Sequence, residues 1–303
     1  MKELKGAFPV LVTPMHEDEE VNYEGLKENI EYFISQGVAG IAVNGSTGEF
    51  VSLTKEEKLK TAELAVEQVN GRIPLIIGTA AETTKDAIMY TKHAEEAGAD
   101  AALLINSYYA HPKDEEIYEH FKAVAESVRF PVMIYNNPFT SGVDIGTETI
   151  LNVARDVSNI THIKESSGDI GKARDISRQG KGFIETFCGS DDLALESLLV
   201  GATGWISVAG NIAPRLVTDL FTSVQENKME LAWELYDKVL PLCNFIEGSG
   251  KYVQIVKRAM DLQGLAGGPS RKPRLGLTED EDKTLKELLA ALDSAAIDGL
   301  PTS

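Results

Sequence analysis

Short apolar runs typical of buried β-strands alternate along the chain with longer segments that have helical patterning. The predicted strands cover residues 8–13, 40–44, 74–79, 101–105, 131–135, 160–164, 183–187 and 205–209. The predicted helices cover residues 23–36, 54–70, 84–97, 114–128, 147–157, 170–178, 193–200 and 214–226. Each strand is therefore followed by a helix, and the connections between them are short.

About eight strand–helix units in a row predict a parallel sheet, because a parallel strand pair needs a crossover connection between its members. Units of this number and length match a closed (β/α)8 TIM barrel. A doubly wound open sheet usually has fewer strands and a glycine-rich turn after the first one. The first predicted strand runs instead into Thr13-Pro14-Met15-His16, which favours the barrel.

After residue 227 the pattern is helical only, with helices predicted at residues 230–245, 251–262 and 279–292. The segment 264–276 is rich in glycine, proline and basic residues and is predicted to connect two of these helices. We therefore expect a barrel domain at 1–227, which carries the catalytic site, and a C-terminal helical extension at 228–303.

Charge and apolar patterning exclude two classes of partner. The net charge is −18 with no offsetting cluster of lysine and arginine, so a nucleic-acid partner is not expected. No segment approaches the roughly 18 consecutive apolar residues of a membrane span, and the N-terminal apolar run is too short for a signal peptide. We expect no membrane association and a cytoplasmic location, where Cys188 and Cys243 stay reduced.

The sixth predicted strand carries a lysine, Lys164, within the sequence His162-Ile163-Lys164-Glu165. A strand side chain at this position points either into the barrel or into the helix layer. Burying an ammonium group is costly, so a buried lysine loses its proton more easily and becomes a nucleophilic amine. Such amines form Schiff bases with carbonyl substrates.

Active sites of such barrels lie at the carboxyl ends of the strands. There the second strand is followed by Ser46 and Thr47 beside glycines, which let the main chain approach a carboxylate. The fifth strand ends in Tyr135, whose hydroxyl can relay protons while a carbinolamine loses water. Together with Lys164, these groups suit a 2-oxo acid as substrate.

Three motifs in this order resemble the dihydrodipicolinate synthase/N-acetylneuraminate lyase family of class I, Schiff-base-forming lyases. The resemblance covers nearly the whole chain. The motifs are Gly45-Ser46-Thr47-Gly48-Glu49, Tyr135-Asn136-x-Pro138 and Lys164-Glu165-x-Ser167.

The resemblance implies a lyase that acts on pyruvate or another 2-oxo acid without a cofactor. It implies an imine on Lys164, acid–base catalysis by Tyr135, and a substrate carboxylate on Ser46, Thr47 and Gly48, with Ser46 also in the catalytic set. Thr140, Asp191 and Ile206 complete the expected substrate-binding set. It further implies a homotetramer, a dimer of dimers, in which Tyr109 enters the neighbouring subunit's site and completes a proton relay.

Two departures from the family pattern keep the substrate open. Thr140 stands where the synthase branch has an arginine, and a threonine cannot give a carboxylate the charged fork of a guanidinium. Val208 is apolar where the sugar-acid branch has a hydroxyl. We therefore expect a catabolic aldolase, dehydratase or deaminase of a small 2-oxo acid or pyrroline carboxylate. Dihydrodipicolinate synthase, which condenses pyruvate with aspartate semialdehyde, and an N-acetylneuraminate lyase-like aldolase are the alternatives.

Two further classes of function are less compatible with these residues. A barrel that binds a 2-oxo acid without turnover would not require the lysine, the tyrosine and the hydroxyl loop together. A metal-dependent aldolase would require a ligand set, but the five histidines show no HExxH or other close ligand spacing. We expect no metal, and we expect His162 to be a packing residue.

Overall fold

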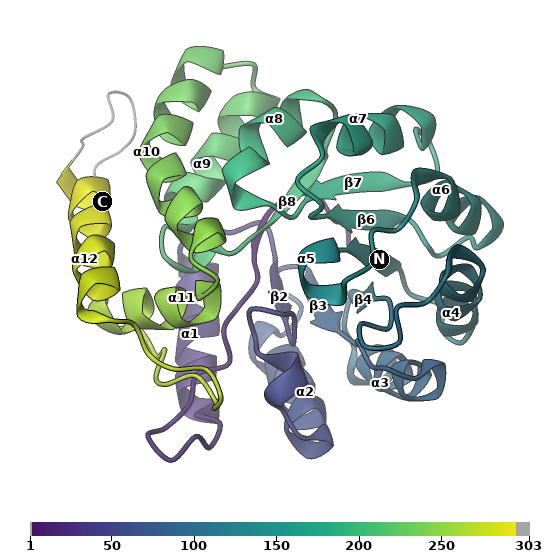
Figure 1. Ribbon diagram of the computed structural model, residues 1–303, viewed down its shortest axis with the longest axis horizontal. Helices are drawn as coiled ribbons and strands as arrows, with labels where there is room; N and C mark the ends of the chain where they lie inside the picture. Colours follow the sequence, from purple (N-terminus) through teal and green to yellow (C-terminus); the bar gives the residue numbers. More distant parts are fainter. Residues whose placement is uncertain (1, 295–303) are drawn as a thin grey trace.

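The computed structural model describes residues 2–294, and its centre is a ring of eight parallel strands surrounded by helices (Figure 1). The strands are β1 (Gly6–Pro9), β2 (Ile41–Val43), β3 (Leu75–Gly78), β4 (Ala101–Ile105), β5 (Val132–Asn136), β6 (His162–Glu165), β7 (Glu185–Cys188) and β8 (Gly204–Ser207). All eight strands that the sequence predicts are present, although most are shorter than expected.

The sheet closes on itself. Its hydrogen-bonded order runs β1-β8-β7-β6-β5-β4-β3-β2, and a parallel bridge between Val10 and Ala42 joins the two ends. The amide of Leu11 also donates to the carbonyl of Ala42 at 2.8 Å. The predicted (β/α)8 TIM barrel is therefore confirmed, and the carboxyl ends of all eight strands open to the same side.

Helices follow the strands in the predicted order. They are α1 (Tyr23–Ser35), α2 (Lys55–Val69), α3 (Thr84–Ala97), α4 (Asp114–Glu126), α6 (Thr147–Asp156), α7 (Ile170–Gln179), α8 (Ala194–Leu199) and α9 (Pro214–Gln225). The capping box of Thr54 and Glu57 forms at the start of α2, as its spacing predicts. The sequence prediction missed one short helix, α5 (Pro138–Ser141), which the side chain of Asn137 caps.

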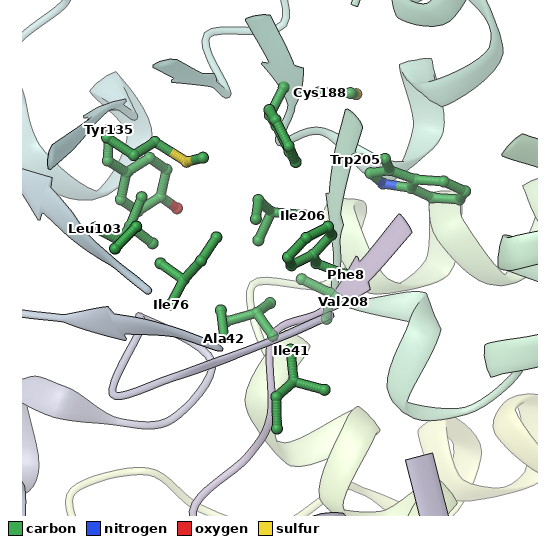
Figure 2. Packing of buried hydrophobic residues seen from close by; sticks show 14 of the residues in the cluster. Phe8, Ile41, Ala42, Ile76, Leu103, Tyr135, Cys188, Trp205, Ile206 and Val208 are labelled. Carbon is green, nitrogen blue, oxygen red and sulfur yellow. The ribbon is translucent and has the colours of Figure 1, made fainter. Parts of the chain in front are cut away.

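Side chains of alternate strand positions fill the barrel, so it has no open channel. Figure 2 shows Phe8, Ile76, Leu103 and Ile206 pointing from four strands toward one another. The rings of Phe8 and Phe187 meet edge to face, with their centroids 5.7 Å apart. These aromatic rings need glycines beside them, because a Cβ at Gly204 would lie 2.1 Å from the Phe187 ring.

Three helices follow the barrel: α10 (Met229–Gly248), α11 (Tyr252–Leu262) and α12 (Glu279–Ser294). α10 packs along α9, and α12 lies beside both α10 and α11 (Figure 1). The division of the chain at residue 227 stays a prediction, and residues 295–303 lie outside the described residues. None of the helices within residues 2–294 is both long and apolar enough to cross a membrane.

A buried ion pair joins this helical region to the loop after β2. Lys257 Nζ lies 2.6 Å from Glu49 Oε1, and the two side chains are 1% and 0% exposed. The ammonium also donates to the Pro269 carbonyl at 2.8 Å. Glu49 Oε2 accepts from the backbone N–H of Arg271 at 3.1 Å. Burial lowers the pKa of Lys257, while the charge of Glu49 opposes that shift.

The segment 264–276, which the sequence predicts as a connection between two helices, also binds the residues that follow β2. The guanidinium of Arg271 donates to both carboxylate oxygens of Glu57, at 2.7 Å each, and to the Ser52 carbonyl at 2.7 Å. Arg274 donates to the Ser52 hydroxyl at 2.9 Å. Residues 263–278 thus hold the loop after β2 from its outer side.

Replacing Lys257 with methionine is expected to lower the free energy of unfolding by about 3–5 kcal/mol, because the buried Glu49 carboxylate loses its ammonium partner. Urea denaturation followed by far-UV circular dichroism measures the change. Lys181→Met, at an exposed lysine, is the matched control and should stay within about 0.5 kcal/mol of the parent. Equal stabilities of the two variants would contradict a stabilising role for the pair.

Candidate active site

A cleft of about 680 Å³ lies over the carboxyl ends of the strands. Its walls come from the loop after β2, the ends of β5 to β8, and the facing ends of α10 and α11. Five of the residues that the sequence predicts for the site line this cleft: Ser46, Thr47, Tyr135, Thr140 and Lys164. The cleft is therefore where the predicted chemistry can take place.

Lys164 and Tyr135 are direct neighbours in the sheet. Their Cα atoms are register partners between β5 and β6, so both side chains point into the barrel. Lys164 is 3% exposed, and its Nζ lies 4.2 Å from the centroid of the Tyr135 ring. No carboxylate within residues 2–292 forms an ion pair with this ammonium. The amine is therefore free to react with a carbonyl group that enters the cleft.

The environment of Tyr135 lowers the pKa of its phenol group. Burial raises the pKa of the phenol, but the positive charge of Lys164 and hydrogen bonds from Asn137, Ser46 and Lys164 outweigh burial. The pKa of Tyr135 therefore lies below its usual value of 10. Asn137 Nδ2 donates to the phenol oxygen at 2.8 Å. A tyrosine in this state can exchange a proton with the neighbouring lysine.

The loop after β2 presents two hydroxyl groups to the cleft. Thr47 is 2% exposed and Ser46 is half-buried. The loop is held from below, because Thr13 Oγ1 donates to the carbonyl of Gly48 at 2.7 Å. Gly48 itself does not line the cleft. The loop therefore offers the hydroxyls of Ser46 and Thr47 to a substrate carboxylate, on a backbone that the barrel and Glu49 hold in place.

Ser166 is a lining residue that the sequence analysis missed. It is 4% exposed, it lies two positions after Lys164, and its Oγ has no hydrogen-bond partner in the described part of the chain. A Cβ at Gly189 would lie 1.9 Å from this oxygen and 2.8 Å from Lys164 Cε. Glycine at 189 therefore leaves the space that both side chains occupy. The period of two along β6 could have revealed Ser166, because it continues the face of Lys164.

Asp191 does not face the cleft, although the sequence analysis placed it in the substrate-binding set. Its carboxylate is 0% exposed and accepts from Trp205 Nε1 at 2.6 Å, from the Ala209 amide at 2.6 Å and from the Val208 amide at 2.9 Å. Burial raises the pKa of Asp191 to about 6, and these hydrogen bonds oppose the shift. The neighbouring Asp192 lines the cleft instead.

Ile206 and Tyr109 also lie outside the cleft lining. Ile206 is fully buried in the barrel below it (Figure 2). Tyr109 lies on the loop after β4 with its side chain 85% exposed, and its backbone N–H donates to Glu82 Oε1 at 2.6 Å. A role of Tyr109 in the site of a neighbouring subunit stays a prediction.

The end of α10 contributes residues that the sequence analysis did not assign to the site. Glu247, in the last turn of this helix, lines the cleft together with Asn244 and with Tyr252 of α11. Burial and the charge of Asp191 raise the pKa of Glu247 to about 7, and the charge of Lys164 opposes the shift. Glu247 Oε1 accepts from the backbone N–H of Asp191 at 3.3 Å.

Comparisons with known proteins point to one protein family. The chain matches the model of the dihydrodipicolinate synthetase family over residues 3–292. It is 38% identical over 291 residues to a 4-hydroxy-tetrahydrodipicolinate synthase of Neisseria gonorrhoeae, covering 95% of this chain and 98% of that protein. It is 36% identical over 282 residues to the synthase of that name from Bacillus subtilis, covering 93% and 97%.

Solved structures give the same result. The dihydrodipicolinate synthase of Acinetobacter baumannii, solved in complex with pyruvate, superposes with a TM-score of 0.91 at 34% identity and covers 96% of this chain and 99% of its own. The Aquifex aeolicus enzyme gives a TM-score of 0.92 at 34% identity, with coverage of 96% and 98%. A family match over nearly the whole chain, together with relatives above one-third identity, shows that the chain belongs to the dihydrodipicolinate synthetase family.

Proposed function

We propose that this lyase forms a Schiff base between Lys164 and the carbonyl carbon of pyruvate or another 2-oxo acid, and that it makes or breaks a bond through the derived enamine. The observation that carries the proposal is the buried ammonium of Lys164, which has no carboxylate partner within residues 2–292 and lies 4.2 Å from the centre of the Tyr135 ring. The hydroxyls of Ser46 and Thr47 line the same cleft and can hold the carboxylate of the acid.

The proton movements follow from this arrangement. An ionised Tyr135 takes a proton from the Lys164 ammonium, and the free amine attacks the carbonyl carbon. The hydroxyl group of the resulting carbinolamine, which was the carbonyl oxygen, takes the proton back from Tyr135 and leaves as water, so that a protonated imine forms. Loss of a proton from the adjacent carbon then gives the enamine, which is the nucleophile for addition to an aldehyde.

A second, narrower candidate is 4-hydroxy-tetrahydrodipicolinate synthase, in which the enamine of pyruvate adds to aspartate semialdehyde. The names of the relatives from Neisseria gonorrhoeae and Bacillus subtilis favour it. Thr140 lies at the mouth of the cleft and provides a hydroxyl but no positive charge for the carboxylate of that aldehyde. We therefore keep the broader 2-oxo acid lyase as the main proposal.

We also propose that the enzyme works in the cytoplasm as a homotetramer in which Tyr109 completes the site of a neighbouring chain. The exposed fraction of the Tyr109 side chain, 85%, supports this, since such a large aromatic surface favours a contact with another molecule. Glu82 holds the loop in position, because its carboxylate accepts from the backbone of Tyr109 and from the hydroxyl of Ser107.

Borohydride trapping tests the imine. With pyruvate present, reduction should add one pyruvate-derived group to Lys164, detectable by peptide mass spectrometry. Lys164→Ala should lose the adduct and at least about 10³-fold in kcat/KM, because no other group can form the covalent intermediate. An adduct on a different lysine, or none with any 2-oxo acid, would contradict the proposed mechanism.

Replacing Tyr135 with phenylalanine should lower kcat by about 10²–10⁴-fold, the usual contribution of general acid–base catalysis. The ring packing is kept, so the loss reports the phenol group alone. Steady-state kinetics and stopped-flow rates of imine formation measure it. Tyr118→Phe, which removes a hydroxyl bound to Asp156 on the outside of the barrel, is the control and should keep parental activity. Equal activities of Tyr135→Phe and the parent would remove Tyr135 from the proton relay.

Mixed oligomers test the sharing of Tyr109 between chains. Lys164→Ala and Tyr109→Phe should each have low activity alone. After joint unfolding and refolding, activity should reappear, because a chain with intact Lys164 can receive Tyr109 from a Lys164→Ala chain. Analytical ultracentrifugation of the same sample checks that oligomers have formed. Mixed oligomers that stay inactive would place the action of Tyr109 within its own chain, or outside catalysis.

A further inference from the structure

The cleft is larger than the reacting 2-oxo acid needs. Its volume of about 680 Å³ lies within the range of roughly 300–1,000 Å³ that is usual for drug-sized ligands. The acid occupies the part next to Lys164, Ser46 and Thr47. The remaining part extends to the last turn of α10, where Asn244 and Glu247 form the wall. The second reactant, or the departing half of a substrate, must lie there.

The outer part of the cleft is lined by acidic side chains, which is unusual for an enzyme whose substrate carries a carboxylate. Among the residues that line the cleft in the described part of the chain, Lys164 is the only cation, whereas Asp192 and Glu247 are both carboxylic acids. The positive charge of Lys164 is not available to a second ligand, because the protonated imine lies beside the carboxylate of the 2-oxo acid. Among the described residues no second cation lines the outer part, so a carboxylate there would meet carboxyl groups of the same sign.

Two polar groups of the lining, the Glu247 carboxyl and the Ser166 hydroxyl, can accept a hydrogen bond from a ligand. The Glu247 carboxyl makes one long contact, from the Asp191 amide at 3.3 Å, which leaves its other oxygen available to a ligand. Ser166 Oγ is a second polar group in the lining, with 4% exposure and no hydrogen-bond partner among the described residues. Because this hydroxyl lines the cleft, a bound ligand can supply its missing partner.

We propose that Glu247, with Ser166 beside the imine, forms a subsite that binds a hydrogen-bond donor of the second reactant, an ammonium or a hydroxyl group, and that disfavours a carboxylate at this position. The inference rests on the proposed Schiff-base function. It deepens that function by assigning the chemical class of the second reactant: an aldehyde that carries donors near the reacting carbon. Glu247 acts on the selection of this reactant and takes no part in imine formation.

Three aldehydes of similar size separate the relevant groups, each tested with saturating pyruvate. Aspartate semialdehyde carries an ammonium and a carboxylate, glyceraldehyde carries hydroxyls only, and succinic semialdehyde carries a carboxylate only. The readout is kcat/KM for the aldehyde, from the consumption of pyruvate. The parent's preference between the first two identifies an ammonium or a hydroxyl as the recognised donor.

The variant Glu247→Gln keeps the shape of the side chain and removes its charge. Its kcat/KM should fall at least about tenfold for the preferred donor-bearing aldehyde, the effect of losing a hydrogen bond to a charged group. For succinic semialdehyde it should stay the same or rise. Glu230→Gln, at an exposed glutamate in the first turn of the same helix, is the matched control and should match the parent with all three aldehydes.

Borohydride trapping with pyruvate alone tests the proposed Schiff-base function separately from the subsite. If the parent forms no adduct on Lys164, the proposed function fails and this inference fails with it. If the parent and Glu247→Gln both form the adduct, only the aldehyde data decide. Equal losses with all three aldehydes, no loss with any, a parent that prefers succinic semialdehyde, or a parent that turns over no donor-bearing aldehyde would each overturn the subsite.

Discussion

The proposed chemistry depends on one positive charge, the Lys164 ammonium, held inside the barrel without an ion-pair partner among residues 2–292. Burying an ammonium in this way is costly unless nearby groups stabilise it or it can lose its proton. The ring and hydroxyl of Tyr135 are the nearest such groups, and the charge of Lys164 lowers the pKa of Tyr135 in return. The two side chains lie close enough for the proton transfer that the proposed mechanism requires.

The helices after the barrel are part of the site, although no residue of α10, α11 or α12 belongs to the predicted catalytic set. From below, Lys257 of α11 neutralises Glu49, which ends the loop that carries Ser46 and Thr47. From above, the last turn of α10 brings Glu247 over the strand ends. The first contact holds the loop that carries these two hydroxyls, and the second forms the outer wall of the cleft. A change in the extension can therefore alter substrate choice without touching the catalytic lysine.

The sequence was sufficient for the fold and for the placement of Lys164 beside Tyr135, because both depend on local patterns. Strand–helix alternation predicts the barrel, and the carboxyl ends of its strands must converge, so Lys164 and Tyr135 had to meet. The sequence was not sufficient to predict contacts between residues that lie far apart along the chain. The pairing of Lys257 with Glu49 and the approach of Glu247 to the strand ends depend on how the extension packs. Asp191 and Asp192 show a finer limit, since two adjacent carboxylates at a strand end point in different directions.

Asp191 also explains how the Glu247 carboxyl group is held at the outer part of the cleft. The carboxylate of Asp191 accepts hydrogen bonds from Trp205 and from the amides of Val208 and Ala209. It therefore fixes the turn after β8 against the end of β7. Its own amide then faces Glu247 and limits where that carboxyl group can lie. The buried Asp191 therefore positions the accessible carboxyl group of Glu247. Burial and the negative charge of Asp191 together raise the pKa of Glu247 to about 7. The outer part of the cleft thus carries carboxyl groups, whereas the inner part holds Lys164, the one cation among the described lining residues.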